Sequence, residues 1–432
     1  MKVCKFGGSS VADENQIKKV RAILESDPER TIVVVSAPGK RDKQDKKITD
    51  MLYECVALVS DGRTCHPVFK DIFKRYMDIA KGLGLESPEL EKALNEVEKN
   101  IDAGLGRDYA GSRGEYLNAV LISKYLGWEF IDAQEYVIIN DDGTVDPETY
   151  TKLSKRLKKG GHYCMPGFYG ATKNGMVKTF SRGGSDISGA IAARAADAEI
   201  YENWTDVSGM LAADPRVVED PKVIEFLTYK QVRELAEVGA SVFHEEAIAP
   251  VIPIGVKINI RNTNRPEDPG TMIVPELYTG DLVGVSAKGG FTRVSIRKLL
   301  LFKRRGVRHA FFTALHLFGV TPVFSFFGVD SIVVLFPSSQ ASDKVVEDMC
   351  SRLKADFQLD EINYERAQAV VGIVGGRMNN STAFIDAATA LKKSRIAINL
   401  VNHGASDVST LFVIRDEDRE RAVEAIYNEL FV

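Results

Sequence analysis

The chain of 432 residues lacks the features that mark membrane-spanning, secreted and nucleic-acid-binding proteins. No stretch approaches the roughly 20 apolar residues that a membrane-spanning helix needs. A strand pattern begins at the N-terminus itself, so we expect no signal peptide. The formal net charge is −4 and the sequence contains no polybasic run, which argues against a groove for nucleic acid.

Cysteine is scarce as well, with five residues and no CxxC spacing. This predicts free thiols in a reducing, cytoplasmic setting and no disulfide framework. The zinc motif HExxH is incomplete in "HEEA", where Ala247 stands near the place of the second histidine, and we expect no metal held by the protein alone. The Walker sequence GxxxxGK[ST] is missing, and no Ser-His or Cys-His constellation is apparent.

What the sequence does contain is an alternation of strand and helix patterns over its first 280 residues. The run "IVVVSA" is continuously apolar, as expected of a strand buried on both faces. Leucine, valine and isoleucine recur at helical spacing over 90–101. Strands separated by helices predict an α/β fold whose mostly parallel open sheet has helices on both faces. The expected strands are 32–37, 130–133, 199–206 and 256–262.

The composition changes over 261–280, where three prolines and two glycines interrupt any long element. We place a domain boundary at about residue 280. The remainder looks duplicated, because "SIVVLF" at Ser331 is followed by "STLFVI" at Ser409. Each copy combines these strands with helices in the order β-α-β-β-α. This predicts two ferredoxin-like modules, at about 281–366 and 367–432, either separate or intertwined.

The stretch "KFGGSS" brings Lys5 to the carboxyl end of a strand, where open α/β sheets bind ligands. Gly7 and Gly8 allow the backbone to approach a ligand and to present N–H groups. A helix that begins near Asp13 adds partial positive charge. Together these features suit a phosphate group, although a tight turn with a surface lysine is the plainer alternative.

A second glycine pair occurs in "FSRGGSDISGAIAARAA", before a helix rich in alanine. Arg182 can form two parallel hydrogen bonds to a carboxylate or phosphate. Asp186 lies in the first helical turn and could be no more than a helix cap. The stretch is not the GxSxG elbow of hydrolases, because Ile187 stands where the last glycine should be.

Two further stretches indicate a binding site only when they are taken together with the two glycine pairs. "WTDVSGMLAADPR" follows a strand, and such loops line nucleotide sites, but it could be an ordinary turn. In "AGSRGEYLNAVLISKYL" we expect Gly114 and Glu115 at a helix start. There Glu115 could bind an amine or could simply favour the helix dipole.

The four stretches together resemble the aspartokinases, in which "KFGGSSVA", "SRGE", "FSRGGSD" and "WTDVSGMLAADPR" occur in this order. The resemblance covers nearly the whole chain. It implies an amino-acid kinase domain at 1–280 and a regulatory region at 281–432 with two ACT modules of βαββαβ form. The implied reaction transfers the γ-phosphoryl group of ATP, carrying Mg²⁺, to the β-carboxylate of L-aspartate. That is the first step toward lysine, threonine and methionine.

The resemblance also implies site residues. Lys5 would neutralise the moving phosphoryl group, and Asp186 would orient the catalytic groups. Arg182 would hold the α-carboxylate of aspartate and Glu115 its amine. Ser36, Ala37 and Ser185 would lie near the substrate. The nucleotide would contact Lys5, Gly7, Gly8, Ser9, Thr205, Asp206, Leu211, Arg216, Ser241 and Val242.

Two departures from the family pattern bear on binding. Many relatives have a lysine where this chain has Ser241, in "GASVFHEEA", so one usual nucleotide contact is in doubt. Lysine-sensitive relatives have a Ser-Glu pair where this chain reads Gly328-Val329-Asp330. We therefore expect a lysine or threonine effector at the ACT modules, with Asp330 as the candidate partner of a lysine ammonium. A homodimer or higher homo-oligomer, paired through these modules, is also expected.

Two rival interpretations remain open. Acetylglutamate kinase and uridylate kinase share the kinase fold but lack paired ACT modules. A non-catalytic amino-acid sensor would also have this architecture, although the presence of Lys5, Arg182 and Asp186 argues against a decayed site. Activity with a panel of substrates separates the three.

Overall fold

The computed structural model describes residues 1–157, 160–181, 183–240, 243, 245–276, 282–303 and 305–432. The chain forms two compact units. The first comprises Met1–Leu211, Val223–Ala236 and Ser241–Leu277, and the second comprises Ala212–Lys222, Glu237–Ala240 and Tyr278–Val432. The second unit therefore includes two short segments from the middle of the chain.

An eight-stranded sheet forms the centre of the first unit, in the order β3-β4-β2-β1-β7-β9-β10-β8. All neighbouring pairs are parallel except β9 with β10. The strands are β1 (Lys2–Phe6), β2 (Arg30–Val35), β3 (Glu129–Phe130), β4 (Tyr163–Pro166), β7 (Ile200–Thr205), β8 (Phe226–Thr228), β9 (Lys257–Asn262) and β10 (Thr271–Val274). A separate hairpin joins β5 (Tyr169–Ala171) to β6 (Val177–Thr179).

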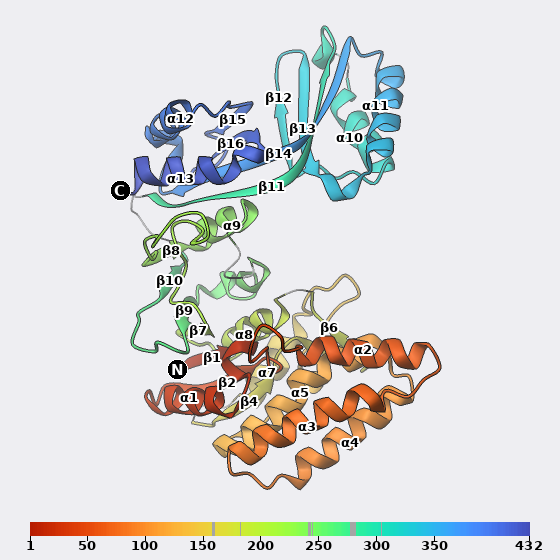
Figure 1. Ribbon diagram of the computed structural model, residues 1–432, viewed down its shortest axis with the longest axis vertical. Helices are drawn as coiled ribbons and strands as arrows, with labels where there is room; N and C mark the ends of the chain where they lie inside the picture. Colours follow the sequence, from red (N-terminus) through yellow and green to blue (C-terminus); the bar gives the residue numbers. More distant parts are fainter. Residues whose placement is uncertain (158–159, 182, 241–242, 244, 277–281, 304) are drawn as a thin grey trace. The chain divides into compact units, whose positions relative to one another are not determined.

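Helices cover both faces of this sheet, as the sequence predicts (Figure 1). One face carries alternate residues of β1 and β2, such as Cys4 and Val33, which pack under a layer of five helices. That layer consists of α1 (Glu14–Glu25), α2 (Ile48–Ser60), α3 (His66–Gly82), α4 (Pro88–Asp102) and α5 (Gly106–Leu126). The other face of β1 and β7 packs against α8 (Gly184–Ala195). The remaining helices are α6 (Ala133–Tyr136), α7 (Glu148–Arg156) and α9 (Tyr229–Glu237).

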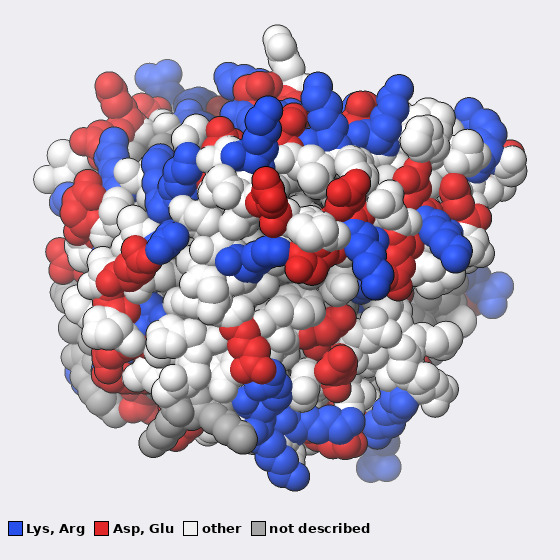
Figure 2. Space-filling view, turned by 90° about the horizontal axis from the view of Figure 1, so that it is seen from below, with Lys and Arg blue, Asp and Glu red and all other residues white. Residues whose placement is uncertain are grey.

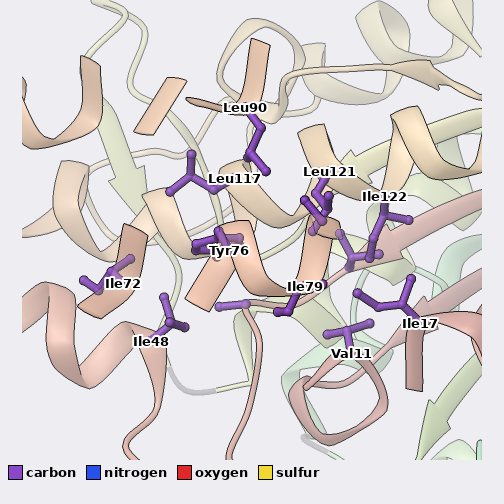
Figure 3. Close-up of a cluster of buried hydrophobic side chains, with 14 of the residues drawn as sticks. Val11, Ile17, Ile48, Ile72, Tyr76, Ile79, Leu90, Leu117, Leu121 and Ile122 are labelled. Carbon is purple, nitrogen blue, oxygen red and sulfur yellow. The ribbon is translucent and has the colours of Figure 1, made fainter. Parts of the chain in front are cut away.

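The core of the five-helix layer is built from the helical stripes that the sequence shows. In Figure 3, apolar side chains from all five helices meet, including Ile17, Tyr76, Leu90 and Leu121. Full burial of such a side chain contributes about 1.5–3 kcal/mol. Asp13 starts α1 by accepting the backbone N–H groups of two residues that follow it. Val11 belongs to the same core, so the turn at the first glycine pair is anchored on this layer.

Two of the predicted elements in this unit differ from the structure. The strand expected at 130–133 ends at Phe130, because Asp132 caps α6 and the helix begins at Ala133. The helix expected to start at Gly114 begins eight residues earlier, at Gly106. Gly111 and Gly114 are buried contact points rather than helix breakers, because a Cβ on Gly111 would lie 2.8 Å from the Tyr53 hydroxyl and one on Gly114 would lie 2.7 Å from the Ala37 Cβ. Glu115 is therefore in the middle of α5.

The second unit contains one antiparallel sheet of six strands, in the order β12-β13-β11-β14-β16-β15. Two long strands, β11 (Leu282–Arg297) and β14 (Glu361–Gly375), pair at its centre. The other strands are β12 (Phe324–Phe327), β13 (Ser331–Pro337), β15 (Leu400–His403) and β16 (Ser409–Arg415). The helices are α10 (Val307–Leu317), α11 (Asp343–Phe357), α12 (Ala383–Lys393) and α13 (Arg419–Leu430).

The duplicated pattern appears in this sheet as two halves that share their central strands. The half of β11 from Phe291 onward pairs with β13, and the second half of β14 pairs with β16. The first half of β11 pairs with that same part of β14. One βαββα set is thus inserted between the strands of the other.

Two surface properties of the described residues bear on membranes and nucleic acids. Among the residues that the structure describes, no helix is both long and apolar enough to cross a bilayer. Figure 2 shows lysine and arginine side chains interspersed with aspartate and glutamate over one face. Mixed charge of this kind does not match the continuous basic stripe that binds phosphate backbones.

Candidate active site

Lys5 is the starting point of the site because it is a charged residue inside a buried strand. Successive residues of β1 point to opposite faces, so Cys4 and Phe6 enter the five-helix layer while Lys5 points toward α8. Its side chain is only 9% exposed, and its Nζ lies 2.6 Å from Oδ1 of Asp186. The alternative of a surface lysine beside a turn is therefore wrong.

Asp186 reaches this position because α8 begins with the second glycine pair. Gly183 has a φ of 75°, a left-handed conformation that glycine adopts without strain. A Cβ on Gly184 would lie 2.7 Å from the ring of Phe168. Asp186 lies in the first turn, and its carboxylate meets Lys5 instead of capping the helix. The interpretation of Asp186 as a simple helix cap is therefore wrong.

The first glycine pair brings two loops into close backbone contact. Gly8 accepts a hydrogen bond from the Gly39 N–H, and a Cβ on Gly39 would lie 2.6 Å from the Gly8 carbonyl carbon. Gly7 donates its N–H to the Trp204 carbonyl, so this group is not presented to a ligand as the sequence suggests. Ser9 follows in a short 3₁₀ turn, Gly8–Val11.

Glu115 is a buried carboxyl on α5 and contacts the loop after β2. A Cβ on the preceding Gly114 would lie 2.7 Å from the Ala37 Cβ, so helix and loop touch. The Ala37 N–H lies near enough to the Glu115 carboxyl to lower its pKa, and Asn118 donates from Nδ2 to the Ser36 carbonyl at 2.7 Å. Among the described residues, Oε2 of Glu115 has no hydrogen-bond partner. Because buried polar groups nearly always have a hydrogen-bond partner, this free acceptor suits a ligand that brings a hydrogen-bond donor.

The pKa of Glu115 is raised to about 8, chiefly because burial removes the carboxylate from water. The Ala37 N–H and the positive charges of Arg113 and Lys5 act in the opposite direction. A ligand ammonium next to Oε2 would favour the ionised form in the same way. Displacement of the pKa toward neutrality is typical of functional carboxyls.

The other predicted substrate residues are only partly placed. Ser185 lies beside Asp186, and its side chain would meet a Cβ on Gly167 at 2.8 Å. Arg182 lies outside the described residues. The structure thus brings together Lys5 and Asp186, and it places Ser36, Ala37 and Glu115 close enough for the Lys5 charge to act on the Glu115 carboxyl.

The predicted nucleotide residues are spread more widely. Thr205 ends β7, and its hydroxyl bonds Oδ1 of Asp206 at 3.2 Å. Leu211 pairs with Val223 in an isolated bridge. Arg216 belongs to the second compact unit, where its Nε donates to Asp214 at 3.0 Å. Ser241 and Val242 lie outside the described residues.

Two residues of β7 join the site although the motifs do not include them. Asn203 donates from Nδ2 to Asp186 Oδ1 at 2.9 Å, and Tyr201 donates its hydroxyl to the Asp186 carbonyl at 3.1 Å. The signal in the sequence is "YENW", where polar residues interrupt a strand that is otherwise expected to be buried. A buried polar side chain needs a partner, so its partner is often a site residue.

The opposite face of the same strand contains a structural ion pair. Glu202 accepts two hydrogen bonds from Arg30, at 2.8 and 3.1 Å, and a third from the Trp204 indole at 3.0 Å. All three side chains are buried. The pair ties β2 to β7 across β1 and supports the strand that carries Lys5.

Comparison with known proteins agrees with this geometry. The model of the amino acid kinase family matches residues 1–262, and that of the ACT domain matches residues 371–430. Aspartokinase 3 of Bacillus subtilis is 34% identical over 449 residues, covering 100% of this chain and 99% of the relative.

This chain belongs to the aspartokinase family. The crystal structure of the aspartate kinase of Clostridium acetobutylicum matches it with a TM-score of 0.92 and 41% identity over the full length of both chains. Aspartokinase III of E. coli, in complex with aspartate and ADP, matches with a TM-score of 0.80 and 23% identity. The aspartokinase architecture therefore extends over both units. The rival interpretations as acetylglutamate kinase or uridylate kinase lose their support.

Proposed function

We propose that this aspartokinase transfers the γ-phosphoryl group of ATP to the β-carboxylate of L-aspartate, with Lys5 and Asp186 at the reacting centre. The contact of Lys5 Nζ with Asp186 Oδ1 carries the proposal, because it joins the two glycine turns at one point. In the reaction a carboxylate oxygen bonds to the γ-phosphorus. The bond from that phosphorus to the bridging oxygen breaks, and its electron pair stays on ADP.

No strong base is needed, because the β-carboxylate is already ionised at neutral pH. Such transfers depend on positioning and on stabilisation of the oxygens that carry charge. We assign the second task to the Lys5 ammonium, which also lies 3.4 Å from where a Gly7 Cβ would be, directly over the glycine turn. Mg²⁺ arrives as part of the ATP substrate and retains water ligands, so it needs no dedicated protein cage.

We assign Glu115 to the amine of aspartate and Arg182 to its α-carboxylate, with Ser36, Ala37 and Ser185 beside them. The unpartnered Oε2 of Glu115 supports the first assignment. Gly7, Gly8, Ser9, Thr205, Asp206, Leu211, Arg216, Ser241 and Val242 remain proposed nucleotide residues.

A substrate panel tests the proposal. ATP consumption is measured with L-aspartate, N-acetylglutamate and UMP, with the Asp186→Asn protein as the matched control. We expect aspartate-dependent ADP release that is strongly reduced, but still measurable, in the control. Consumption with another acceptor, or silence with aspartate together with tight amino-acid binding, would favour a rival enzyme or a sensor.

We further propose that residues 1–280 act as the catalytic domain and 281–432 as a regulatory region that binds lysine or threonine. Open edges at β12 and β15 support a homodimer through this region, because unpaired edge strands favour pairing with another chain. Light scattering on the purified chain measures the oligomer. A cytoplasmic location stays a prediction from the five cysteines, all of them buried free thiols.

A further inference from the structure

The side chains of Lys5, Asp186 and Asn203 all contact one another on the face of the sheet that α8 covers. Lys5 Nζ contacts Asp186 Oδ1 at 2.6 Å, Asn203 Nδ2 donates to the same Oδ1 at 2.9 Å, and Lys5 Nζ donates to Asn203 Oδ1 at 3.5 Å. Lys5 and Asn203 are direct partners in the parallel pairing of β1 with β7. The amide is buried, with 4% of the residue exposed.

The orientation of the Asn203 amide follows from its two neighbours. Its oxygen can only face the ammonium and its NH₂ can only face the carboxylate, since the flipped amide would oppose donor to donor and acceptor to acceptor. The amide therefore holds both members of the ion pair at once. An ammonium has three N–H groups, and the two contacts within the described residues leave one for a phosphoryl oxygen.

The strand β7 also holds the backbone of Asp186. The Tyr201 hydroxyl donates to the Asp186 carbonyl at 3.1 Å, and Tyr201 fits there because a Cβ on Gly189 would lie 2.5 Å from its hydroxyl. Tyr201 and Asn203 are two residues apart and therefore share a face of the strand. One strand thus fixes the side chain and the main chain of Asp186.

We infer that Asn203 is a positioning residue that acts through Asp186 to keep the Lys5 ammonium in line with the transferred phosphoryl group. The inference rests on the proposed function. Without the amide, the Asp186 carboxylate loses one of its two described partners and can rotate about its side-chain bonds. The Lys5 ammonium then moves with the Asp186 carboxylate, away from the phosphoryl oxygens on which negative charge develops. The proposed contact of Glu115 with the substrate does not change.

The test measures kcat and both KM values for Asn203→Leu, Asp186→Asn and the double variant in the full chain. Removal of a group that orients a metal-ligating residue typically costs about 10- to 100-fold, and we take the same order for a group that orients the Asp186 carboxylate. We expect Asn203→Leu to lower kcat by about that factor, with each KM within about twofold. In the Asp186→Asn background the same change should cost almost nothing, because residues that act as a unit are not additive.

Asn259→Leu is the matched control. Asn259 is a buried asparagine on the neighbouring strand β9, and its Nδ2 bonds the Pro269 carbonyl. We expect it to leave kcat unchanged. If Asn203→Leu lowers the melting temperature so far that it cannot be assayed, Asn203→Ser, which is smaller and still polar, takes its place with the same expected loss.

The outcomes separate the inference from the proposed function. Normal turnover of Asn203→Leu, beside a strongly impaired Asp186→Asn, overturns the positioning role and leaves the function standing. The positioning role is also overturned if Asn203→Leu lowers kcat by the same factor in the Asp186→Asn background as in the unmutated protein. A change in KM alone, with kcat unaffected, has the same consequence. Full activity of Asp186→Asn overturns the assignment of Asp186 and the inference with it.

Discussion

At the scale of single residues, the site depends on ionisable groups that lie away from water. Lys5 and Glu115 are both buried, but they differ in whether another side chain compensates the buried group. The ammonium of Lys5 is compensated by the carboxylate of Asp186, whereas Glu115 has an oxygen without a partner in the described chain. Electrostatic contacts of this kind are stronger in a dry site than in water, which suits charge stabilisation in phosphoryl transfer.

Lys5→Ala should lower kcat by about 10²- to 10³-fold, because the loss of one electrostatic contact to the transition state costs about that much. Circular dichroism should show an unchanged fold. Lys2→Ala is the control, since Lys2 is on the same strand but pairs with Asp27 at 2.7 Å, away from the site. Near-normal turnover of Lys5→Ala would remove Lys5 from the mechanism.

Glu115→Gln should raise the KM for aspartate more than that for ATP, because the neutral amide gives up the charge that attracts the amine. In the unmutated protein kcat/KM for aspartate should rise as the pH approaches 8, since the pKa of Glu115 is about 8. A variant in which the ATP KM alone rises would contradict the assignment of Glu115 to the substrate.

The same substitution should change stability in a pH-dependent way. The folded-state pKa of Glu115 lies above its ordinary value of 4.5, so the folded chain binds this proton more tightly than the unfolded chain does. Stability from this group is complete below about pH 4.5 and is lost as the pH rises to about 8. Glu115→Gln should therefore melt higher than the unmutated protein at pH 8.5, and the difference should shrink toward pH 5.

At the scale of elements, the site depends on turns that approach one another too closely for side chains. The loop after β1 and the loop after β2 meet at Gly8 and Gly39. On the other side, α8 begins at a left-handed glycine so that Asp186 falls in its first turn. These close contacts limit the movement of the loops and of the helix start that carry the proposed site residues, and phosphoryl transfer depends on such positioning.

Gly39→Ala should lower both kcat and the melting temperature, because its Cβ would lie 2.6–2.8 Å from backbone atoms of Gly8 and Ser9, which cannot move as a flexible side chain can. Gly104→Ala is the control. Gly104 has a φ of 81° and open space around it, so alanine there introduces backbone strain without a clash. Equal kcat for the two variants would show that the approach of the loops is not needed for catalysis.

At the scale of the whole molecule, the kinase unit is joined to a regulatory sheet whose halves share two strands. An effector can inhibit only if it binds one conformation better than another. Asp330 is the candidate partner of a lysine ammonium, and its Oδ1 accepts the Leu300 N–H at 2.8 Å. Its carboxylate therefore orders the loop before α10 as well as offering negative charge.

Asp330→Asn should relieve inhibition by lysine at least tenfold in the half-inhibitory concentration, because it removes the charge and keeps an acceptor for Leu300. Activity without lysine should not change. Asp360→Asn is the matched control, because Asp360 accepts the N–H of the neighbouring Leu299 at 2.8 Å. If lysine does not inhibit the unmutated enzyme, the assignment of Asp330 to a lysine ammonium is wrong. Inhibition by threonine instead would support an effector site in this region but not lysine as its ligand.

Much of this organisation could be predicted from local patterns. The continuous apolar run "IVVV" predicts the buried strand β2, and the apolar stripe at helical spacing predicts α4. The glycine pairs Gly7-Gly8 and Gly183-Gly184 can be recognised in the sequence at the turns that begin the next helices. The duplicated strands around Ser331 and Ser409 are likewise confirmed as β13 and β16. Each of these features is determined by residues close together in the chain.

What only the tertiary structure decided involves residues far apart in the sequence. Gly111 and Gly114 lie inside α5, where Tyr53 and Ala37 pack against them, and no local rule identifies buried glycines in a helix. The roles of Asn203 and Tyr201 depend on the parallel pairing of β7 with β1 and on the packing of α8 against both. Hydrogen bonds between side chains are set by strand register and helix packing, so the sequence by itself determined which residues are polar, and the fold decided which of them meet.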